Sequence, residues 1–209
     1  MRAEPAVASH PGFVTVVSGL PRSGTSLMMK MLEAGGLESM TDGLRAADED
    51  NPRGYYELER VKQLPKGDTA WVADARGKVV KVISALLEHL PTGHEYRIIF
   101  MRRRMEEVLA SQRQMLVRRG KPTDATADAV MASLFDKHLK RVATWLASRP
   151  EIHRLDIDHA VLMAEPAAQA ARVAQFLGGH LDVARMAGVV DASLHRQRAG
   201  DTGPATANG

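Results

Sequence analysis

Short apolar runs rich in β-branched residues alternate along the chain with segments of helical periodicity. Each of the apolar runs is six residues long, which suits a buried strand and is too short for a buried helix. The predicted strands are Phe13–Ser18, Lys78–Ile83, Tyr96–Met101 and Ile152–Ile157.

Four longer segments between and after these runs predict helices, because their apolar residues recur at helical spacing or their ends carry helix signals. Leu134, Leu139, Val142 and Leu146 form an apolar stripe on the longest of them. The region from Gly43 to Gly77 is rich in breakers and predicts long loops with one or two short helices, and a helical turn is expected at Leu86–Leu90. The predicted helices are Leu27–Ala34, Glu106–Arg119, Thr126–Ser148 and Pro166–Leu177.

Strands that alternate with helices predict an α/β protein with a central, mostly parallel β-sheet flanked by helices in three layers. We expect one P-loop-type domain over residues 13–198, with flexible termini at 1–12 and 199–209. In such sheets, ligands bind beyond the carboxyl ends of the strands. The segments that follow the strands are therefore the places to look for chemistry.

The composition of the chain excludes some classes of function and makes others less favourable. The chain of 209 residues has no cysteine, which excludes disulfides, thiolate metal sites and cysteine nucleophiles. A net charge of +3 and only 4% aromatic residues do not favour a nucleic-acid partner. The histidines show no metal-ligand spacing, so no metal is expected. No apolar run could span a membrane and the first twelve residues lack a signal-peptide core, so we expect a cytoplasmic protein.

The segment Gly19–Ser26 has the composition of an anion-binding loop between a strand and a helix. Gly19 and Gly24 allow backbone N–H groups to turn toward an anion, and the following helix directs its N-terminus to the same place. Ser23, Thr25 and Ser26 add hydroxyl donors, and Arg22 adds a positive charge. The spacing is that of a Walker A loop, but Thr25 stands where a nucleotide kinase has its lysine.

Pro21–Ser26 closely resembles the 5′-phosphosulfate loop of the sulfotransferase family, whose donor is 3′-phosphoadenosine-5′-phosphosulfate (PAPS). With Arg22 at its second position, this loop is similar to the loops of the tyrosylprotein, carbohydrate and bacterial branches. The family's 3′-phosphate site is an arginine that ends a strand and a serine eight positions later, which Arg103 and Ser111 match. The resemblance implies a metal-free PAPS site made of Arg22, Ser23, Gly24, Thr25, Ser26, Arg103 and Ser111.

The resemblance also implies an in-line transfer of the sulfuryl group to an acceptor hydroxyl or amine. A cation must meet the charge that develops on the bridging oxygen, and we assign this role to Arg22 with Lys81 as a helper. Lys81 matches a lysine of the cytosolic branch, but Ile83 stands where that branch has its histidine base. Glu57 lies in the irregular stretch between the two phosphate motifs, where an acceptor pocket would form, and is the first candidate for the general base, with Glu59 and His89 as rivals.

Several alternatives stay open at this stage. One is a P-loop kinase that acts on a small metabolite, and another is a non-catalytic nucleotide- or nucleic-acid-binding module that uses the basic helix Arg113–Lys121. The acceptor could be a small molecule, a carbohydrate, a lipid or a peptide, and the oligomeric state is not readable. Arg196 and Arg198 are further candidates for the 3′-phosphate.

Overall fold

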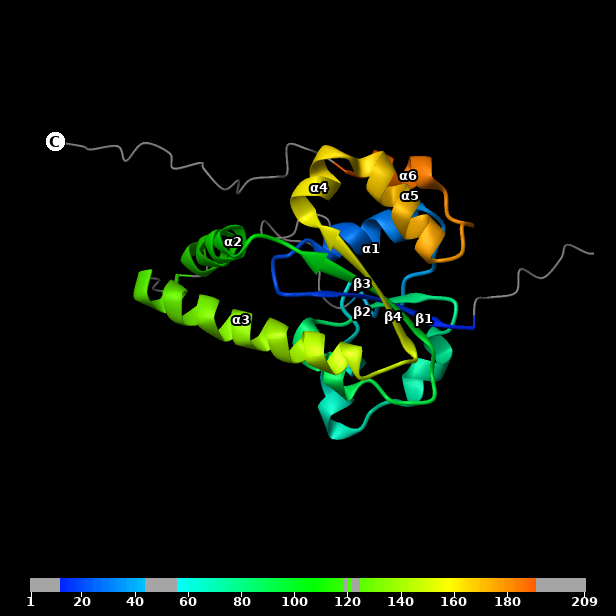
Figure 1. The fold of residues 1–209 in the computed structure, drawn as a ribbon, viewed down its shortest axis with the longest axis horizontal. Coiled ribbons are helices and arrows are strands. Elements are labelled where there is room, and N and C mark those ends of the chain that lie inside the picture. The colour runs from blue at the N-terminus through cyan, green and yellow to red at the C-terminus, as the bar shows by residue number, and fades with distance from the viewer. Residues whose placement is uncertain (1–11, 44–55, 119, 122–124, 191–209) are drawn as a thin grey trace, which may run out of the picture.

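A computed structural model describes residues 12–43, 56–118, 120–121 and 125–190. Its strands form one parallel sheet in the order β2-β1-β3-β4, which confirms the predicted α/β class (Figure 1). All four predicted strands are present to within a few residues. They are β1 (Val14–Gly19), β2 (Val79–Lys81), β3 (Tyr96–Arg102) and β4 (Ile152–Asp158).

All four predicted helices are present, and the predicted short helices occur as 3₁₀ segments. None of the helices in the described ranges is both long enough and apolar enough to cross a membrane. The α-helices are α1 (Thr25–Ala34), α2 (Met105–Arg118), α3 (Ala125–Ala147), α4 (His159–Ala164), α5 (Pro166–Phe176) and α6 (Val183–Gly188). The 3₁₀ segments are η1 (Glu59–Lys66), η2 (Ala70–Ala75) and η3 (Ser84–His89).

Two short helices, α4 and α6, were not predicted from the sequence. Each begins at an aspartate that caps its N-terminus. The Asp158 side chain accepts hydrogen bonds from the N–H groups of Ala160 and Val161, and Asp182 accepts one from Arg185. Aspartate is a preferred N-cap residue because its carboxylate satisfies amides that have no partner within the helix. These capping residues were the sequence signal that could have revealed both helices.

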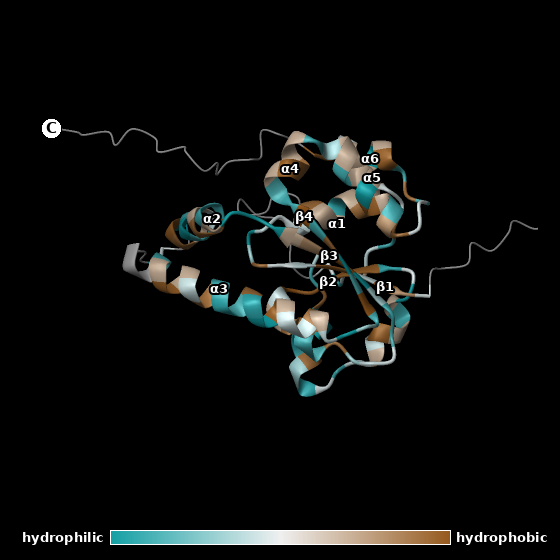
Figure 2. Ribbon diagram, in the orientation of Figure 1, coloured by the Kyte–Doolittle hydropathy of each residue, from teal (hydrophilic) through white to brown (hydrophobic). Residues whose placement is uncertain are grey.

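The sheet is covered on both faces, which gives the three layers expected (Figures 1 and 2). One face packs on α1, α4, α5 and α6, and the other on η1–η3 and the carboxyl-terminal half of α3. The first core includes Met28, Leu32, Ile157 and Met186, and the second includes Trp71, Val80, Ile98 and Leu146.

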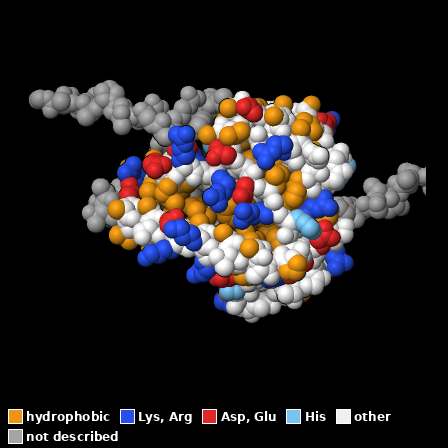
Figure 3. Space-filling model, in the orientation of Figure 1, with side chains coloured by type: hydrophobic (Ala, Val, Ile, Leu, Met, Phe, Trp, Pro, Cys, Tyr) orange, Lys and Arg blue, Asp and Glu red, His pale blue; other side chains and the backbone are white. Residues whose placement is uncertain are grey.

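The apolar stripe predicted on α3 is only partly buried. Val142 and Leu146 are each 6% exposed, whereas Leu134 is 55% exposed, so the stripe joins the core only in the carboxyl-terminal half of the helix. The reason is that the amino-terminal half of α3 extends past the sheet beside α2, where it has no core to join (Figure 1). Hydrophobic side chains gather on the surface between these two helices, with Lys and Arg around them (Figure 3).

The carboxyl ends of all four strands lie along one edge of the sheet. Gly19 pairs with Met101, and Arg102 pairs with Asp158. Lys81, the last residue of β2, lies beside Val17 of β1. The segments that follow these strands therefore converge, as parallel topology requires.

Candidate functional site

The loop after β1 has the backbone of an anion-binding turn. Gly19, Arg22 and Gly24 have φ angles of 149°, 68° and 98°. Positive φ angles of this kind are typical of loops that bind anions through their backbone. Helix α1 starts immediately afterwards at Thr25, so its positive N-terminal end lies next to the loop.

The Ser23 side chain bonds within the loop itself. Ser23 is only 1% exposed, and both its hydroxyl and its N–H donate to the carbonyl of Leu20, at 2.7 and 3.2 Å. A buried hydroxyl needs such a partner because an unsatisfied one is costly. The structure thus gives the Ser23 side chain a loop-shaping contact, while Thr25 and Ser26 are half-buried in the first turn of α1.

Gly24 is packed closely against His159, which is buried at the start of α4. A Cβ atom at position 24 would lie 2.6 Å from Cδ2 of this imidazole. Sequence reasoning missed His159, although its place two residues after a predicted strand was a signal. Both the left-handed φ of Gly24 and this contact favour glycine at the position.

Replacing Gly24 with alanine should destabilise the protein more than replacing Gly36, which has a matching φ of 97° but open space where a Cβ atom would lie. The φ effect alone costs roughly 1–2 kcal/mol. Thermal unfolding of the two variants measures the difference. Equal losses of stability would show that His159 moves aside without destabilising the protein. Adding His159→Ala to Gly24→Ala should bring the stability of the double variant toward that of Gly36→Ala.

The two predicted phosphate motifs meet in space. Nε of Arg22 donates to Oγ of Ser111 at 2.9 Å, and a terminal guanidinium nitrogen of Arg103 donates to the backbone carbonyl of Arg22 at 3.0 Å. The loop after β1 is thus joined to Arg103, just before α2, and to Ser111 within α2, each more than 80 positions from Arg22. Positively charged donors and the Ser111 hydroxyl converge, as a site for a ligand with several phosphates needs.

Glu107 is a member of this cluster that sequence reasoning missed. Its carboxylate accepts a hydrogen bond from Nε of Arg103 at 2.9 Å, and the two side chains are only 5% and 10% exposed. The pair lies one helical turn apart, a spacing that was visible in the sequence. Glu107 fixes one edge of the Arg103 guanidinium and so orients the group.

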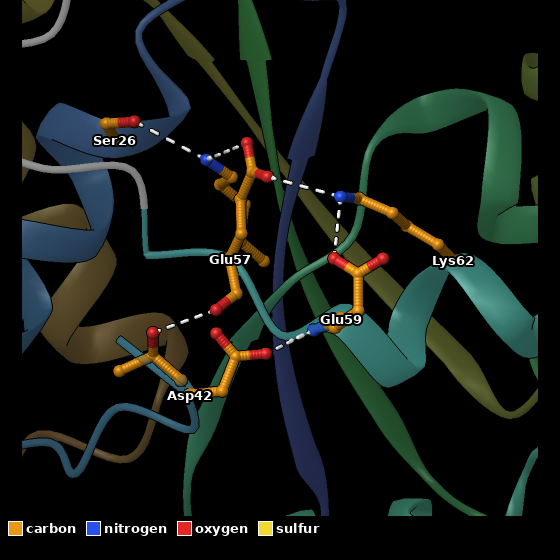
Figure 4. Close-up of polar contacts among 7 residues, drawn as sticks. Ser26, Asp42, Glu57, Glu59 and Lys62 are labelled. Carbon is orange, nitrogen blue, oxygen red and sulfur yellow. Dashed lines mark hydrogen bonds and ion pairs between the residues drawn. The ribbon is translucent and has the colours of Figure 1, made fainter. Parts of the chain in front are cut away.

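A second cluster joins the loop Gly19–Ser26, called the anion loop below, to β2 and to the segment before η1 (Figure 4). The Lys81 side chain is 7% exposed, and its ammonium lies 3.5 Å from Oγ of Ser26 and 4.0 Å from a carboxylate oxygen of Glu57. The other carboxylate oxygen of Glu57 lies 3.7 Å from the ammonium of Lys62. A cation, a carboxylate and an anion-loop hydroxyl are therefore brought together.

The rivals of Glu57 are more exposed than Glu57 itself, whose side chain is 24% exposed. Glu59 is 54% exposed and its carboxylate pairs with Lys62 at 2.7 Å, while His89 is exposed at the end of η3. Ile83, two residues after Lys81, is 41% exposed.

The basic helix and the two carboxyl-terminal arginines were the remaining candidates from the sequence. Within the basic helix, Arg113 is paired with Asp128 of α3, so part of that positive charge is neutralised. Arg196 and Arg198 lie outside the described residues. In the part of the chain that the structure describes, no group of three or more His, Asp or Glu residues could hold a metal ion.

Comparisons with known proteins identify the fold. No family model matches the chain, and no curated protein sequence matches it significantly. The solved structure of the sulfotransferase STF1 from Mycobacterium tuberculosis H37Rv is similar, with 18% identity, a TM-score of 0.55, and coverage of 90% of this chain and 72% of that one.

Two other sulfotransferase domains match with a TM-score of 0.49 and 16% identity each. The domain from the Synechococcus PCC 7002 olefin synthase is covered over 87% of its length by 95% of this chain. The domain from the curacin biosynthetic pathway is covered over 75% of its length by 81% of this chain. On the likeness to STF1, the resemblance seen in the loop and in Arg103–Ser111 is confirmed at the level of the fold: the chain has the fold of a sulfotransferase.

Proposed function

We propose that the protein is a PAPS-dependent sulfotransferase that acts on a hydroxyl or amine acceptor. The observation that carries this proposal is the contact of Lys81 with both Ser26 of the anion loop and Glu57. A cation for the transferred group and a base for the acceptor are thus adjacent to the place where the donor's phosphosulfate would bind.

The residues present fit a donor with anions at two positions. The positive-φ loop and the N-terminus of α1 suit the 5′-phosphosulfate. Arg103, oriented by Glu107, and the hydroxyl of Ser111 suit the 3′-phosphate. Arg22 contacts Ser111 through its side chain and Arg103 through its carbonyl, so it would link the two subsites and add positive charge to both.

The transfer forms one bond and breaks one. The acceptor oxygen or nitrogen forms a bond to sulfur, while the bond from sulfur to the bridging phosphate oxygen breaks, and the adenosine bisphosphate leaves with the electron pair. Glu57 takes the proton of the acceptor. Lys81, with Arg22, offsets the charge that develops on the bridging oxygen.

Thermal-shift measurements with 3′-phosphoadenosine-5′-phosphate (PAP), ATP–Mg and single-stranded DNA test the donor assignment. At about 100 times its Kd, PAP should raise Tm by roughly 5–10 °C, since saturation adds about 2.7 kcal/mol. Arg103→Lys and Ser111→Ala should reduce this shift, because they remove a forked guanidinium and a hydroxyl. Arg102→Ala, on an exposed neighbour, is the matched control and should keep it.

The other ligands separate the alternatives. Stabilisation by ATP–Mg and none by PAP would favour the small-metabolite kinase and reject the sulfotransferase. Stabilisation by DNA alone would favour the nucleic-acid-binding module. Transfer from labelled PAPS to phenols, sugars, lipids and tyrosine peptides then identifies the acceptor class.

A further inference from the structure

The residue before the proposed base has an unusual backbone. Tyr56 has a φ of 50°, in the left-handed region. A bulky residue rarely adopts this conformation because its Cβ approaches the following carbonyl, and the surrounding contacts must hold it there.

The contacts that hold Tyr56 lead to the helix of the anion loop. Its hydroxyl donates a hydrogen bond of 2.6 Å to the carboxylate of Glu33 on α1, and its ring packs against the core on that face of the sheet. Burial, together with the Glu33 carboxylate, raises the pKa of the Tyr56 phenol. The hydroxyl thus stays protonated at neutral pH and remains a donor to Glu33.

Two further contacts hold the backbone after Tyr56. Oγ1 of Thr41 donates to the carbonyl of Glu57 at 2.8 Å, and the N–H of Glu59 donates to the carboxylate of Asp42 at 2.6 Å (Figure 4). With its backbone fixed in this way, Glu57 directs its carboxylate to Lys81.

We infer that Tyr56 is a positioning residue of the active site, an assignment that rests on the proposed function. Its hydrogen bond to Glu33 ties the segment that carries the base to the helix that begins at the anion loop. Base and donor are then both held by α1. The distance between the base and the transferred group is thereby fixed. Such positioning matters because a displacement of about 1 Å can lower a rate about 100-fold.

Steady-state kinetics of Tyr56→Phe and of two Glu33 variants test this role. Tyr56→Phe keeps the ring and loses only the hydroxyl, and should lower kcat about tenfold or more, with the KM for PAPS and the Kd for PAP unchanged. Glu33→Ala should have the same effect, whereas Glu33→Gln keeps an oxygen acceptor and should retain most of the activity. Tyr96→Phe, which loses a buried hydroxyl bonded to the Pro91 carbonyl at the far end of β3, is the matched control.

A double variant shows whether Tyr56 acts through Glu57. In a Glu57→Gln background, Tyr56→Phe should lower kcat no further. A kcat of Tyr56→Phe equal to that of the wild type, while Glu57→Gln is impaired, would overturn the inference and leave the proposed function standing. An additive loss in the double variant would also overturn it. If the wild type neither binds PAP nor transfers sulfate, the proposed function falls, and this inference with it.

Discussion

Replacing Glu57 with glutamine should lower kcat for sulfuryl transfer by about 10²–10⁴-fold, the usual contribution of a general base. Glutamine has nearly the same size as glutamate and cannot accept the acceptor's proton. The carboxylate lies 4.0 Å from the ammonium of Lys81, which itself lies 3.5 Å from Ser26, so the loss would occur next to the anion loop. PAP binding should remain, because Glu57 is not among the residues assigned to the donor.

The matched control is Glu59→Gln. Glu59 is the same residue type two positions along the chain, and its exposed carboxylate pairs with Lys62. Turnover from labelled PAPS and a PAP titration on both variants measure the two effects. Full turnover by Glu57→Gln would remove Glu57 as the base, and a comparable loss in Glu59→Gln would move the role to that residue.

Replacing Glu107 with alanine should lower the free energy of unfolding by about 3–5 kcal/mol, because one partner of a buried ion pair is removed. Glu107 and Arg103 are 5% and 10% exposed, and their hydrogen bond is 2.9 Å long. The guanidinium would keep its charge in a buried place without this carboxylate. For a chain of this size, Tm should fall by roughly 10 °C.

Glu106→Ala is the control for this prediction, since Glu106 is the exposed neighbour of Glu107 in the first turn of α2. Denaturant unfolding of both variants measures the difference. A loss below about 1 kcal/mol for Glu107→Ala would mean that the pair behaves like a surface pair. The double variant Arg103→Met with Glu107→Leu should regain stability, since an apolar pair can replace a buried ion pair, and should lose PAP binding.

Much of the fold was predictable because its signals are local. The β-branched runs, the glycine turns and the helical spacing each act over a few residues. All four predicted strands and all four predicted helices are present. The exposure of Leu134 is not readable from such local signals. Its exposed position depends on where the sheet ends beneath α3, which no pattern within the helix records.

For the candidate site, too, some features were visible as local motifs and others were not. The loop at Gly19–Ser26 and the pair Arg103 and Ser111 were visible as motifs, because their spacing along the chain reflects one strand end and one helix. Glu57 and Lys81 were separate candidates, and nothing in their sequence separation indicated that their side chains lie together. For Tyr56 the sequence favoured core packing over a place in an acceptor pocket, and its ring does pack against the core, but its hydrogen bond to Glu33 was not foreseen because that residue lies on another element. Glu107 and His159 went unassigned.

The sequence by itself determined the alternation of strands and helices, the glycine-containing anion loop, and the absence of a kinase lysine after Gly24. These are properties of short segments and of residue type. Only the tertiary structure decided that Arg22 meets Ser111 and that Lys81 meets Ser26 and Glu57. The physical reason is that parallel strands bring their carboxyl ends to one edge, and side chains separated by tens of residues then satisfy one another's charge.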